Sequence, residues 1–427
     1  MKRISPVVNI GTVQIGGGLP PVLQSMTSTD TRDVKKTVAE IQALHTAGAE
    51  IVRLAIPDEA AAEAAVKICQ QVDPVPVVGD FHFGGAEILK AVPKCAEALA
   101  KFRINPGNST DKHFTDFLKR AKKLKKPVRI GVNAGSVSPE ILADSRSLVQ
   151  AVLRTVELSV LTANSLNFPA DQLVLSAKLS SVPETIAVYR SLAQNFPYAL
   201  HLGLTEAGSG LSGEIASTTA MGTLLAEGIG ETFRISLTPK PGKSRTREVD
   251  VGKQILQALE LRNFAPRIIS CPGCGRTQSD QFQRLADEIS GRVEKAFPRW
   301  QKKFPGVETL KIAVMGCVVN GPGEARSADI GLSLPGGGEA SAIVFVRGKK
   351  VADLTGENLT GEFWEILETF VAEHFSKGKK SCCWVPRGQS AKQRWSSYGE
   401  TPRNFKSSER ARTHIFPNWK KLRASLA

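Results

Sequence analysis

The 427-residue sequence has no stretch that approaches the roughly 20 apolar residues of a membrane-spanning helix. Its first residues, Met1 to Pro6, also lack the apolar run of a signal peptide. Cysteine is scarce and scattered: there are seven, an odd number, which argues against the disulfide framework of a secreted protein. From these absences we expect a cytoplasmic protein without a membrane partner.

A strong charge bias is also missing from most of the chain. The net charge is +15, but residues 377–427 alone hold 13 Lys or Arg and two acidic residues, which leaves about +4 for the first 376. We therefore do not expect nucleic acid as a partner of the main body. The tail, residues 376–427, interleaves basic and aromatic residues and could bind a polyanion; we interpret it as a flexible extension or the product of an altered reading frame.

The first 262 residues repeat one unit, in which a short apolar strand is followed by a polar turn and a helical stretch. Strands are predicted at residues 21–26, 50–56, 76–81, 98–104, 127–132, 172–177, 198–204 and 231–237. Helices are predicted at residues 34–47, 58–71, 111–124, 147–163, 183–194, 216–227 and 249–261. This α/β pattern predicts a TIM-like (β/α)8 barrel over residues 1–263. The main alternative is an open doubly wound sheet, but no Gly-x-Gly-x-x-Gly follows the first strand.

In a barrel of this kind, active residues lie at the C-terminal ends of the strands. The polar residues at those positions are Gln24, Ser25, Thr27, Arg53, Asp80, His82, Arg103, Asn105, Arg129, Asn133, Lys178, His201, Glu206, Arg234 and Ser236. Five of them are cations, one from each of five strands, and they would repel one another unless an anion compensates. The predicted ligand therefore carries several negative charges, most simply two phosphoryl groups. Glu206 could relay a proton, hold a substrate hydroxyl, or pair with a neighbouring Arg.

Three cysteines lie in Gly/Pro-rich runs of the C-terminal third. Cys271 and Cys274 form a Cys-x-x-Cys pair, which alone fits a dithiol redox pair, half of a structural zinc site, or coincidence. The neighbourhood of Cys317 offers neither a fourth Cys nor a His, but Glu324 follows seven residues later. Three thiolates and one oxygen suit an iron-sulfur cluster in which one iron can be given up to a substrate.

The region around these cysteines predicts a second, small α+β domain at residues 264–375. Strands are predicted at 310–315 and 342–347, and helices at 279–297 and 362–374. The chain between the two domains is short, which permits hinge motion while keeping them tethered.

Several motifs together resemble the family of 4-hydroxy-3-methylbut-2-enyl diphosphate synthases, iron-sulfur enzymes of the non-mevalonate (MEP) isoprenoid pathway. The resemblance covers roughly residues 3–370. The motifs that carry it are Gln24-Ser25-Met26-Thr27, residues 103–108, residues 129–133, Thr205-Glu206-Ala207-Gly208, Cys271-Pro-Gly-Cys274-Gly-Arg276 and Gly316-Cys317-Val-Val-Asn320-Gly-Pro-Gly-Glu324.

The resemblance implies a reaction. In the family, 2-C-methyl-D-erythritol 2,4-cyclodiphosphate undergoes a two-electron reductive ring opening with loss of a hydroxyl, giving (E)-4-hydroxy-3-methylbut-2-enyl diphosphate. Ferredoxin or flavodoxin supplies the electrons. Members are homodimers in which the cluster domain of one chain closes over the barrel of the other.

The resemblance also implies roles for individual residues. Glu206 would serve proton transfer, and Asn320 would lie beside the cluster and touch substrate. A [4Fe-4S] cluster would be held by Cys271, Cys274, Cys317 and Glu324, with Glu324 giving way to the substrate oxygen. The diphosphate would be bound by Arg53, Arg103, Asn105, Arg129, Asn133, Lys178, Arg234 and Ser236, with His82 close to it.

One departure from the family pattern removes a cation, because Ala216 stands where a Lys is usual. Two other functions stay open at this point. A catalytically silent barrel could bind RNA or another polyanion through its basic tail. An iron-sulfur lyase could act on another phosphorylated diol and would need no external electrons.

Overall fold

The computed structural model describes residues 3–82, 84–107, 112–242, 244–274, 277, 280–317, 319, 321–334 and 341–376. The described chain forms two compact units that divide between Arg262 and Asn263. From residue 377 on, the tail lies outside the described residues. No helix in the described ranges is both long enough and apolar enough to cross a membrane.

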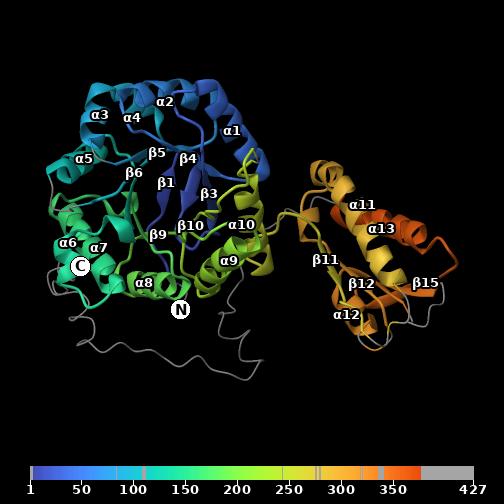
Figure 1. The fold of residues 1–427 in the computed structure, drawn as a ribbon. Coiled ribbons are helices and arrows are strands. Elements are labelled where there is room, and N and C mark those ends of the chain that lie inside the picture. The colour runs from blue at the N-terminus through green and yellow to red at the C-terminus, as the bar shows by residue number, and fades with distance from the viewer. Residues whose placement is uncertain are drawn as a thin grey trace. The chain divides into compact units, whose positions relative to one another are not determined.

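The first unit is a closed barrel of parallel strands in the order β10-β3-β4-β5-β6-β7-β8-β9, ringed by helices (Figure 1). This confirms the predicted barrel and rules out the open sheet. The strands are β3 Val22–Met26, β4 Ile51–Ala55, β5 Val77–Phe81, β6 Lys101–Ile104, β7 Val128–Asn133, β8 Leu173–Lys178, β9 Ala199–Leu202 and β10 Thr232–Phe233. Since β10 has only two residues, the predicted strand at 231–237 is too long.

The helices around the barrel begin at side chains that cap free backbone N–H groups. Asp33, Asp58, Ser147 and Ser181 each accept a hydrogen bond from an N–H in the first turn that follows. The helices are α1 Val34–Ala47, α2 Glu59–Val72, α3 Gly85–Ala91, α4 Pro93–Ala98, α5 Lys112–Lys123, α6 Pro139–Ala143, α7 Leu148–Ser165, α8 Val182–Asn195, α9 Gly210–Ala226 and α10 Thr246–Ala258. The strand predicted from residue 98 starts three residues late because α4 ends there.

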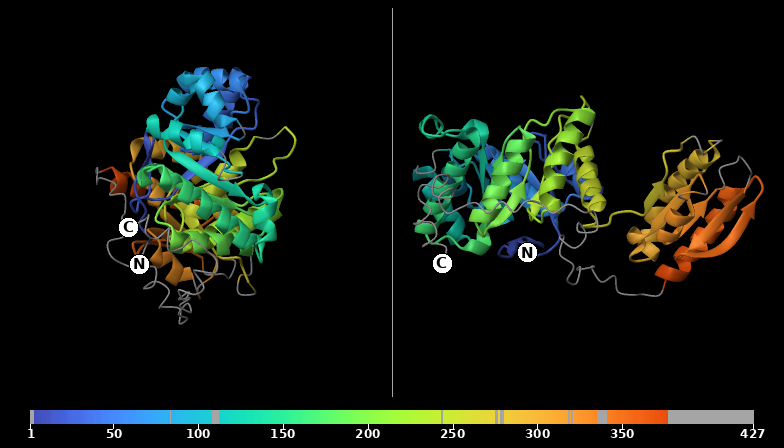
Figure 2. Two further views of the ribbon diagram at one scale, coloured as in Figure 1. Left: turned by 90° about the vertical axis from the view of Figure 1, so that its left-hand side faces the viewer. Right: turned by 90° about the horizontal axis from the view of Figure 1, so that it is seen from below.

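A hairpin that the sequence pattern did not reveal covers one end of the barrel. Its strands are β1 Val8–Ile10 and β2 Val13–Ile15, in the blue segment next to the N-terminus in the right-hand view of Figure 2. They pack their apolar side chains against the first inward-facing layer of the barrel, which is formed by Val22, Ile51, Val78, Val174 and Ala199. This end is therefore sealed by apolar contacts, and the C-terminal ends of the strands form the open mouth.

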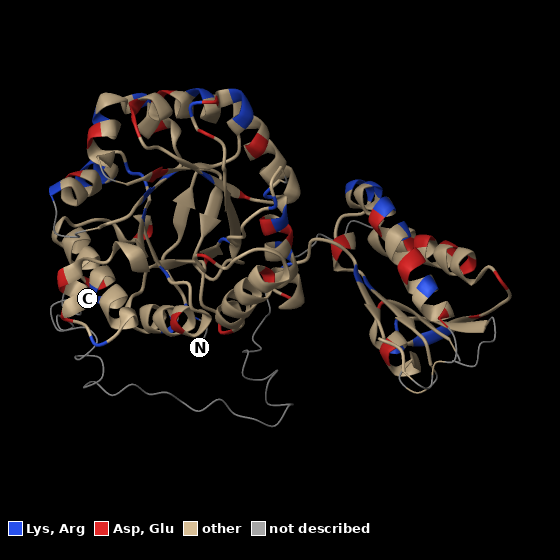
Figure 3. Cartoon of the chain, viewed as in Figure 1, with Lys and Arg blue, Asp and Glu red and all other residues tan. Residues whose placement is uncertain are grey.

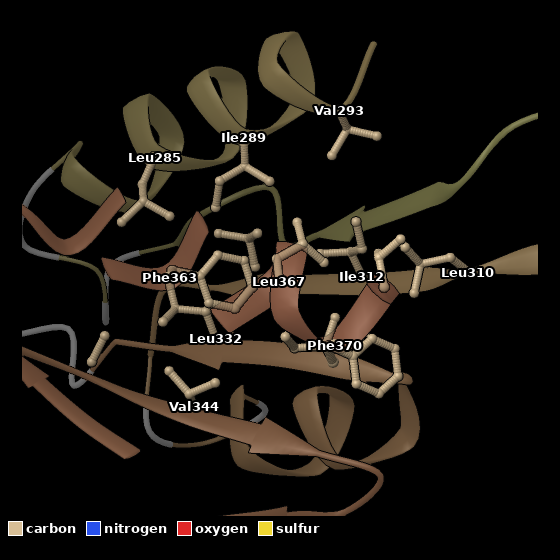
Figure 4. Close-up of a cluster of buried hydrophobic side chains, with 14 of the residues drawn as sticks. Leu285, Ile289, Val293, Leu310, Ile312, Leu332, Val344, Phe363, Leu367 and Phe370 are labelled. Atoms are coloured by element: carbon tan, nitrogen blue, oxygen red, sulfur yellow. The ribbon is translucent and has the colours of Figure 1, made fainter. Parts of the chain in front are cut away.

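The second unit has a five-stranded sheet in the order β11-β12-β13-β14-β15. The first three strands are parallel, and the last two run antiparallel to their neighbours. Helices α11 and α13 pack on one face, where their apolar side chains meet those of the strands (Figure 4). The elements are β11 Arg267–Ser270, α11 Gln281–Lys303, β12 Lys311–Met315, α12 Gly321–Ser327, β13 Ile330–Ser333, β14 Ser341–Val346, β15 Lys349–Thr355 and α13 Leu359–Phe375.

The predicted end of the first of these helices, at residue 297, is wrong. Pro298 lies inside α11, which continues to Lys303. The proline removes one backbone donor, but the turn after it carries Trp300, which is 2% exposed and stacks on Trp364. Burial of this large aromatic side chain keeps the last turn helical.

Candidate active site

The five cations predicted at the barrel mouth are all buried inside the barrel, and Arg129, the second residue of β7, lies deeper than predicted. Each of the five residues is at most 7% exposed. Arg53 lies on β4 and Arg129 on β7. The other three are Arg103 on β6, Lys178 at the end of β8 and Arg234 directly after β10. Figure 3 shows basic residues on the strands inside the ring of helices. The structure therefore brings together side chains that are spread over 182 positions of sequence.

Glycines on the neighbouring strands leave room for these long side chains. A Cβ at Gly131 would lie 2.9 Å from Arg103 Nε and 3.0 Å from Arg129 Nη1. A Cβ at Gly203 would lie 2.6 Å from the Lys178 side chain. All three distances are shorter than ordinary van der Waals contact, so the cations occupy space that glycine leaves open.

Asp80, at the end of β5, is the carboxylate at the centre of the cations. Its Oδ1 accepts a 2.7 Å hydrogen bond from Arg103 Nη1, and its Oδ2 lies 3.6 Å from Arg53 Nε. Burial alone would raise the pKa of Asp80, but the surrounding guanidinium groups outweigh it and hold that pKa well below its usual range. Sequence reasoning placed Asp80 at the mouth without giving it a role, because a strand pattern does not show which arginines a carboxylate meets.

Burial also acts on the cations themselves. It lowers the pKa of Arg53 to about 10, an effect that nearby Arg234 and Arg103 add to and that Asp80 opposes. It lowers the pKa of Arg129 and of Lys178 well below their usual values, and neighbouring arginines lower both further. The mouth thus favours the uptake of negative charge.

Several donors of these side chains have no acceptor among the described residues: Arg103 Nε, Arg129 Nε and Nη2, and Arg234 Nε. Buried donors in proteins are almost always satisfied. Arg53 and Arg234 share one contact, the uncharged sulfur of Met26. It lies 2.9 Å from Arg53 Nη2 and 3.5 Å from Arg234 Nη1. A thioether is a weak acceptor, so it orders the two guanidinium groups without neutralising them.

His82 lies at the rim of the mouth, and its side chain is 54% exposed. Its Nε2 is 2.9 Å from Arg103 Nη1 and 3.9 Å from Asp80 Oδ1. Burial and the two neighbouring arginines lower the pKa of His82, while Asp80 raises it, and the net shift is downward. The imidazole is therefore neutral near pH 7 and can accept a hydrogen bond from Arg103.

Two groups lie deeper in the barrel than the sequence suggested. His201 is fully buried, neither ring nitrogen has a partner among the described residues, and burial together with the nearby cations lowers its pKa well below the usual value. Lys101 at the start of β6 is also fully buried, with Nζ 3.3 Å from Gln24 Oε1, and burial lowers its pKa strongly. Sequence reasoning missed Lys101 because it opens its strand instead of ending it.

The remaining predicted residues lie at or just beyond the C-terminal ends of the strands. Asn105, Asn133 and Ser236 are half-buried directly beyond β6, at the end of β7 and beyond β10. Glu206 is exposed and has φ +56°, a left-handed conformation that is uncommon for a residue other than glycine. Such strain is retained where a loop must present a side chain in one place. Ala216 is half-buried on α9.

Two of the predicted cluster ligands, Cys271 and Cys317, lie just beyond the C-terminal ends of neighbouring strands of the second sheet. Cys271 directly follows β11 and Cys317 follows β12, and these strands are parallel neighbours with Ser270 paired to Val314. The two cysteine-bearing loops therefore leave the sheet side by side. Cys271 is half-buried and packs against the small apolar cluster of Ala313, Met315 and Ala328. Cys317 is 8% exposed, and Cys274 is exposed.

One aromatic ring of α11 lies against both cysteine loops. A Cβ at Gly273 would meet the Phe282 ring at 3.2 Å, and a Cβ at Gly316 would meet it at 2.5 Å. Gly273 has φ +79°, which favours glycine at the turn between the two cysteines of the first loop. Glycine at these two positions therefore lets both cysteine loops pack closely against the same ring.

Glu324 follows on the first turn of α12 and is exposed, and the Cys317 carbonyl accepts a 3.0 Å hydrogen bond from Gly321 N–H at the start of that helix. Within the described ranges, no three His, Cys, Asp or Glu side chains already form a metal-binding group. Asn320 lies outside the described residues. Three thiols and a carboxylate on adjoining loops are nevertheless the donor types of an iron-sulfur site, so the residues present fit such a group.

The fold and the two groups of residues define a class: an enzyme with a TIM barrel whose mouth is cationic, followed by a small thiol-bearing domain. Residues 5–253 match the family model of the GcpE TIM-barrel domain, and residues 267–369 match that of the GcpE protein C-terminal domain. The chain belongs to the GcpE family.

This family is that of the 4-hydroxy-3-methylbut-2-enyl diphosphate synthases. The chain is accordingly an iron-sulfur oxidoreductase that converts 2-C-methyl-D-erythritol 2,4-cyclodiphosphate to 4-hydroxy-3-methylbut-2-enyl diphosphate in the MEP pathway. The family match confirms the predicted function and decides against both the silent barrel and the lyase.

Solved structures of other enzymes also resemble the chain. Dihydropteroate synthase of Xanthomonas albilineans is 13% identical with a TM-score of 0.43, and the match covers 60% of this chain and 98% of that one. The Yersinia pestis dihydropteroate synthase is 12% identical, with a TM-score of 0.42 and coverages of 60% and 97%. N-acetylneuraminic acid synthetase of Leptospira borgpetersenii is 13% identical, with a TM-score of 0.41 and coverages of 68% and 97%. At these scores the likenesses carry no information on function.

Proposed function

We propose that the buried cations of the barrel mouth hold the two phosphoryl groups of the cyclodiphosphate. The observation that carries this proposal is that buried Arg and Lys side chains converge there with donors that lack an acceptor among the described residues. An anionic ligand would satisfy those donors and offset the repulsion among the cations. The residues proposed to bind it are Arg53, Arg103, Asn105, Arg129, Asn133, Lys178, Arg234 and Ser236.

These side chains also stabilise the reaction. Ring opening transfers negative charge to the diphosphate as the C–O bond breaks, and cations that are already ordered stabilise such charge without reorganising. Neutral His82 contacts Arg103 Nη1 at 2.9 Å and would thereby lie close to a diphosphate bound by that arginine. We assign proton transfer to Glu206, whose carboxylate is exposed in the strained loop after β9 and so is accessible to a bound substrate.

In the second unit, the ligands proposed for a [4Fe-4S] cluster are Cys271, Cys274, Cys317 and Glu324. When bound, the cluster supplies electrons and a Lewis-acidic iron for the leaving hydroxyl. The Glu324 carboxylate is the replaceable oxygen ligand of this set, since a carboxylate exchanges more readily than a thiolate. A contact of Asn320 with substrate is proposed from the resemblance alone.

The family further suggests a cytoplasmic homodimer that receives its electrons from ferredoxin or flavodoxin. The two predicted domains, residues 1–263 and 264–375, would then carry the substrate site and the cluster site separately. Neither the donor nor the assembly is needed to test the site itself, because a chemical reductant can replace the donor protein.

The test is anaerobic purification followed by iron and sulfide analysis and by turnover of the cyclodiphosphate with reduced methyl viologen. The native chain is expected to hold about four irons and to need the reductant. Cys317→Ala should lose both the cluster and turnover. The matched control is Cys69→Ala, which removes a half-buried thiol of α2 in the barrel and should retain both. A native chain that holds zinc in place of iron, or a full cluster without turnover, would overturn the proposal.

A further inference from the structure

Glu248 is a buried carboxylate at the barrel mouth to which neither the sequence motifs nor the proposed chemistry assigns a role. It lies in the first turn of α10 and is 3% exposed. Its Oε1 accepts a 3.1 Å hydrogen bond from the Leu237 N–H, and its Oε2 lies 3.4 Å from Arg234 Nη2. Arg245 Nη2 is 3.3 Å from Oε1.

These contacts matter because of where β10 ends. The strand pairing stops at Phe233, yet Arg234 and Ser236, both proposed to bind the diphosphate, follow it. The Arg234 N–H still donates to the Leu202 carbonyl at 3.1 Å, and among the described residues the next backbone hydrogen bond along the segment joins the Thr238 N–H to the Gly208 carbonyl at 3.0 Å. Glu248 contacts this segment at both ends, at the side chain of Arg234 and at the backbone of Leu237.

The charges around Arg234 also single out Glu248. Burial lowers the pKa of Arg234, and Glu248 is the strongest influence that opposes this. The other contact of the Arg234 guanidinium, Met26 Sδ at 3.5 Å, is uncharged. Glu248 thus offsets part of the cost of burying the Arg234 guanidinium and orders it through the contact at 3.4 Å, while Arg234 Nε stays without an acceptor among the described residues.

We infer that Glu248 is a positioning residue that holds Arg234 and Ser236 for the diphosphate. This inference rests on the proposed function of those two residues. The competing explanation is that Glu248 only stabilises the N-terminus of α10, where an acidic side chain is favourable in any helix. The two explanations differ in whether loss of Glu248 acts through Arg234.

The experiment is a double-mutant cycle on the reconstituted full chain, with cyclodiphosphate turnover as the readout. Glu248→Gln removes the charge but keeps an oxygen for the Leu237 N–H. We expect kcat/KM to fall at least about tenfold, mostly through KM, because Arg234 binds the phosphoryl group before and during the reaction. The control Asp250→Asn changes a half-exposed carboxylate of the same helix that pairs with Lys253, and its kcat/KM should stay within about twofold of the native value.

The second arm compares these effects in an Arg234→Met background. If Glu248 acts through Arg234, adding Glu248→Gln there should lower kcat/KM by less than about threefold. Should Glu248→Gln fail to fold, Glu248→Asp replaces it. Because the shorter side chain displaces the charge, kcat/KM should fall at least about threefold in the native background, and this fall should be absent in the Arg234→Met background.

The outcomes separate the inference from the proposed function. Full additivity of the two substitutions, or a Glu248→Gln variant within about twofold of the native chain, overturns the positioning role and leaves Arg234 as a diphosphate ligand. A native-like Arg234→Met variant overturns both.

Discussion

Asp80→Asn is the substitution for which the structure gives the clearest magnitude. The carboxylate is 5% exposed, bonds Arg103 at 2.7 Å and lies 3.6 Å from Arg53. Removing one partner of a buried ion pair costs about 3–5 kcal/mol, because the remaining charge stays buried. The amide oxygen of the variant still accepts one hydrogen bond, so we expect the lower end, about 3 kcal/mol, which for a domain of this size lowers the melting temperature by roughly 6–12 °C.

Calorimetry of the unliganded chain measures this loss of stability, and the pKa shift of Asp80 determines how the loss depends on pH. Because the pKa of Asp80 is held below its usual value, its stabilisation is fully present above the unfolded pKa of about 4 and is lost as the pH falls through the folded pKa. The difference between the native chain and Asp80→Asn should therefore be full at pH 7 and shrink in acid.

The control is Asp116→Asn, whose exposed pair with Lys119 should contribute at most about 1 kcal/mol. Inorganic diphosphate in large excess should raise the melting temperature of Asp80→Asn, since an anion replaces part of the missing charge. An Asp80→Asn variant that melts within about 2 °C of the native chain at pH 7 would refute the reasoning, because the buried arginines would then not depend on this carboxylate.

Three further predictions concern separate parts of the molecule. His201 is buried and its pKa is lowered, so below about pH 6.5 the unfolded chain binds a proton that the folded chain excludes. His201→Gln should therefore reduce the slope of the unfolding free energy against pH in acid by about 1.4 kcal/mol per pH unit. An unchanged slope would contradict this. Glu206→Gln should bind the cyclodiphosphate normally but lose at least about a hundredfold in kcat, and a loss in binding alone would argue against proton transfer. Gly316→Ala places a Cβ 2.5 Å from the Phe282 ring, so it should lower the iron content while leaving diphosphate binding by the barrel intact, and a native iron content would show that the loop has room to spare.

The barrel could be predicted from the sequence because each strand is a short apolar run ended by a polar residue. The same pattern brought Arg53 and Arg103 toward one end, since the ends of parallel strands meet at one edge. Arg129 is the second residue of β7, so its strand position lies deeper in the barrel than the pattern predicted. The hairpin β1–β2 was missed because its three-residue strands are too short for a period to show.

The contacts that organise the site could not be predicted in this way. A strand pattern places Arg234 at the mouth but does not show that Glu248, fourteen residues later on a helix, reaches back to it. Nor does it show that Met26 lies between two arginines, or that Lys101 lies inside the barrel at the start of its strand. These facts depend on side-chain direction across elements that are distant in sequence.

In the second unit, the spacing of the cysteines indicated a cluster, but the sheet that brings them together was only partly predicted. Residues 267–270 form β11, which the sequence pattern did not indicate, and its pairing with β12 places Cys271 and Cys317 on adjoining loops. This strand holds only two apolar residues, Ile268 and Ile269, between Arg267 and Ser270, which is too short an apolar run to indicate a strand.

The central claim is that a diphosphate is the missing partner of the buried cations, and Arg129→Met tests it most directly. Arg129 is 1% exposed and two of its nitrogens have no partner among the described residues. Calorimetric titration with the cyclodiphosphate should show affinity weakened roughly ten- to hundredfold, as expected for the loss of a hydrogen bond to a charged group. The unliganded variant should melt no lower than the native chain, because an uncompensated buried charge has been removed. Native affinity together with a lowered melting temperature would contradict the account, since Arg129 would then be a structural cation.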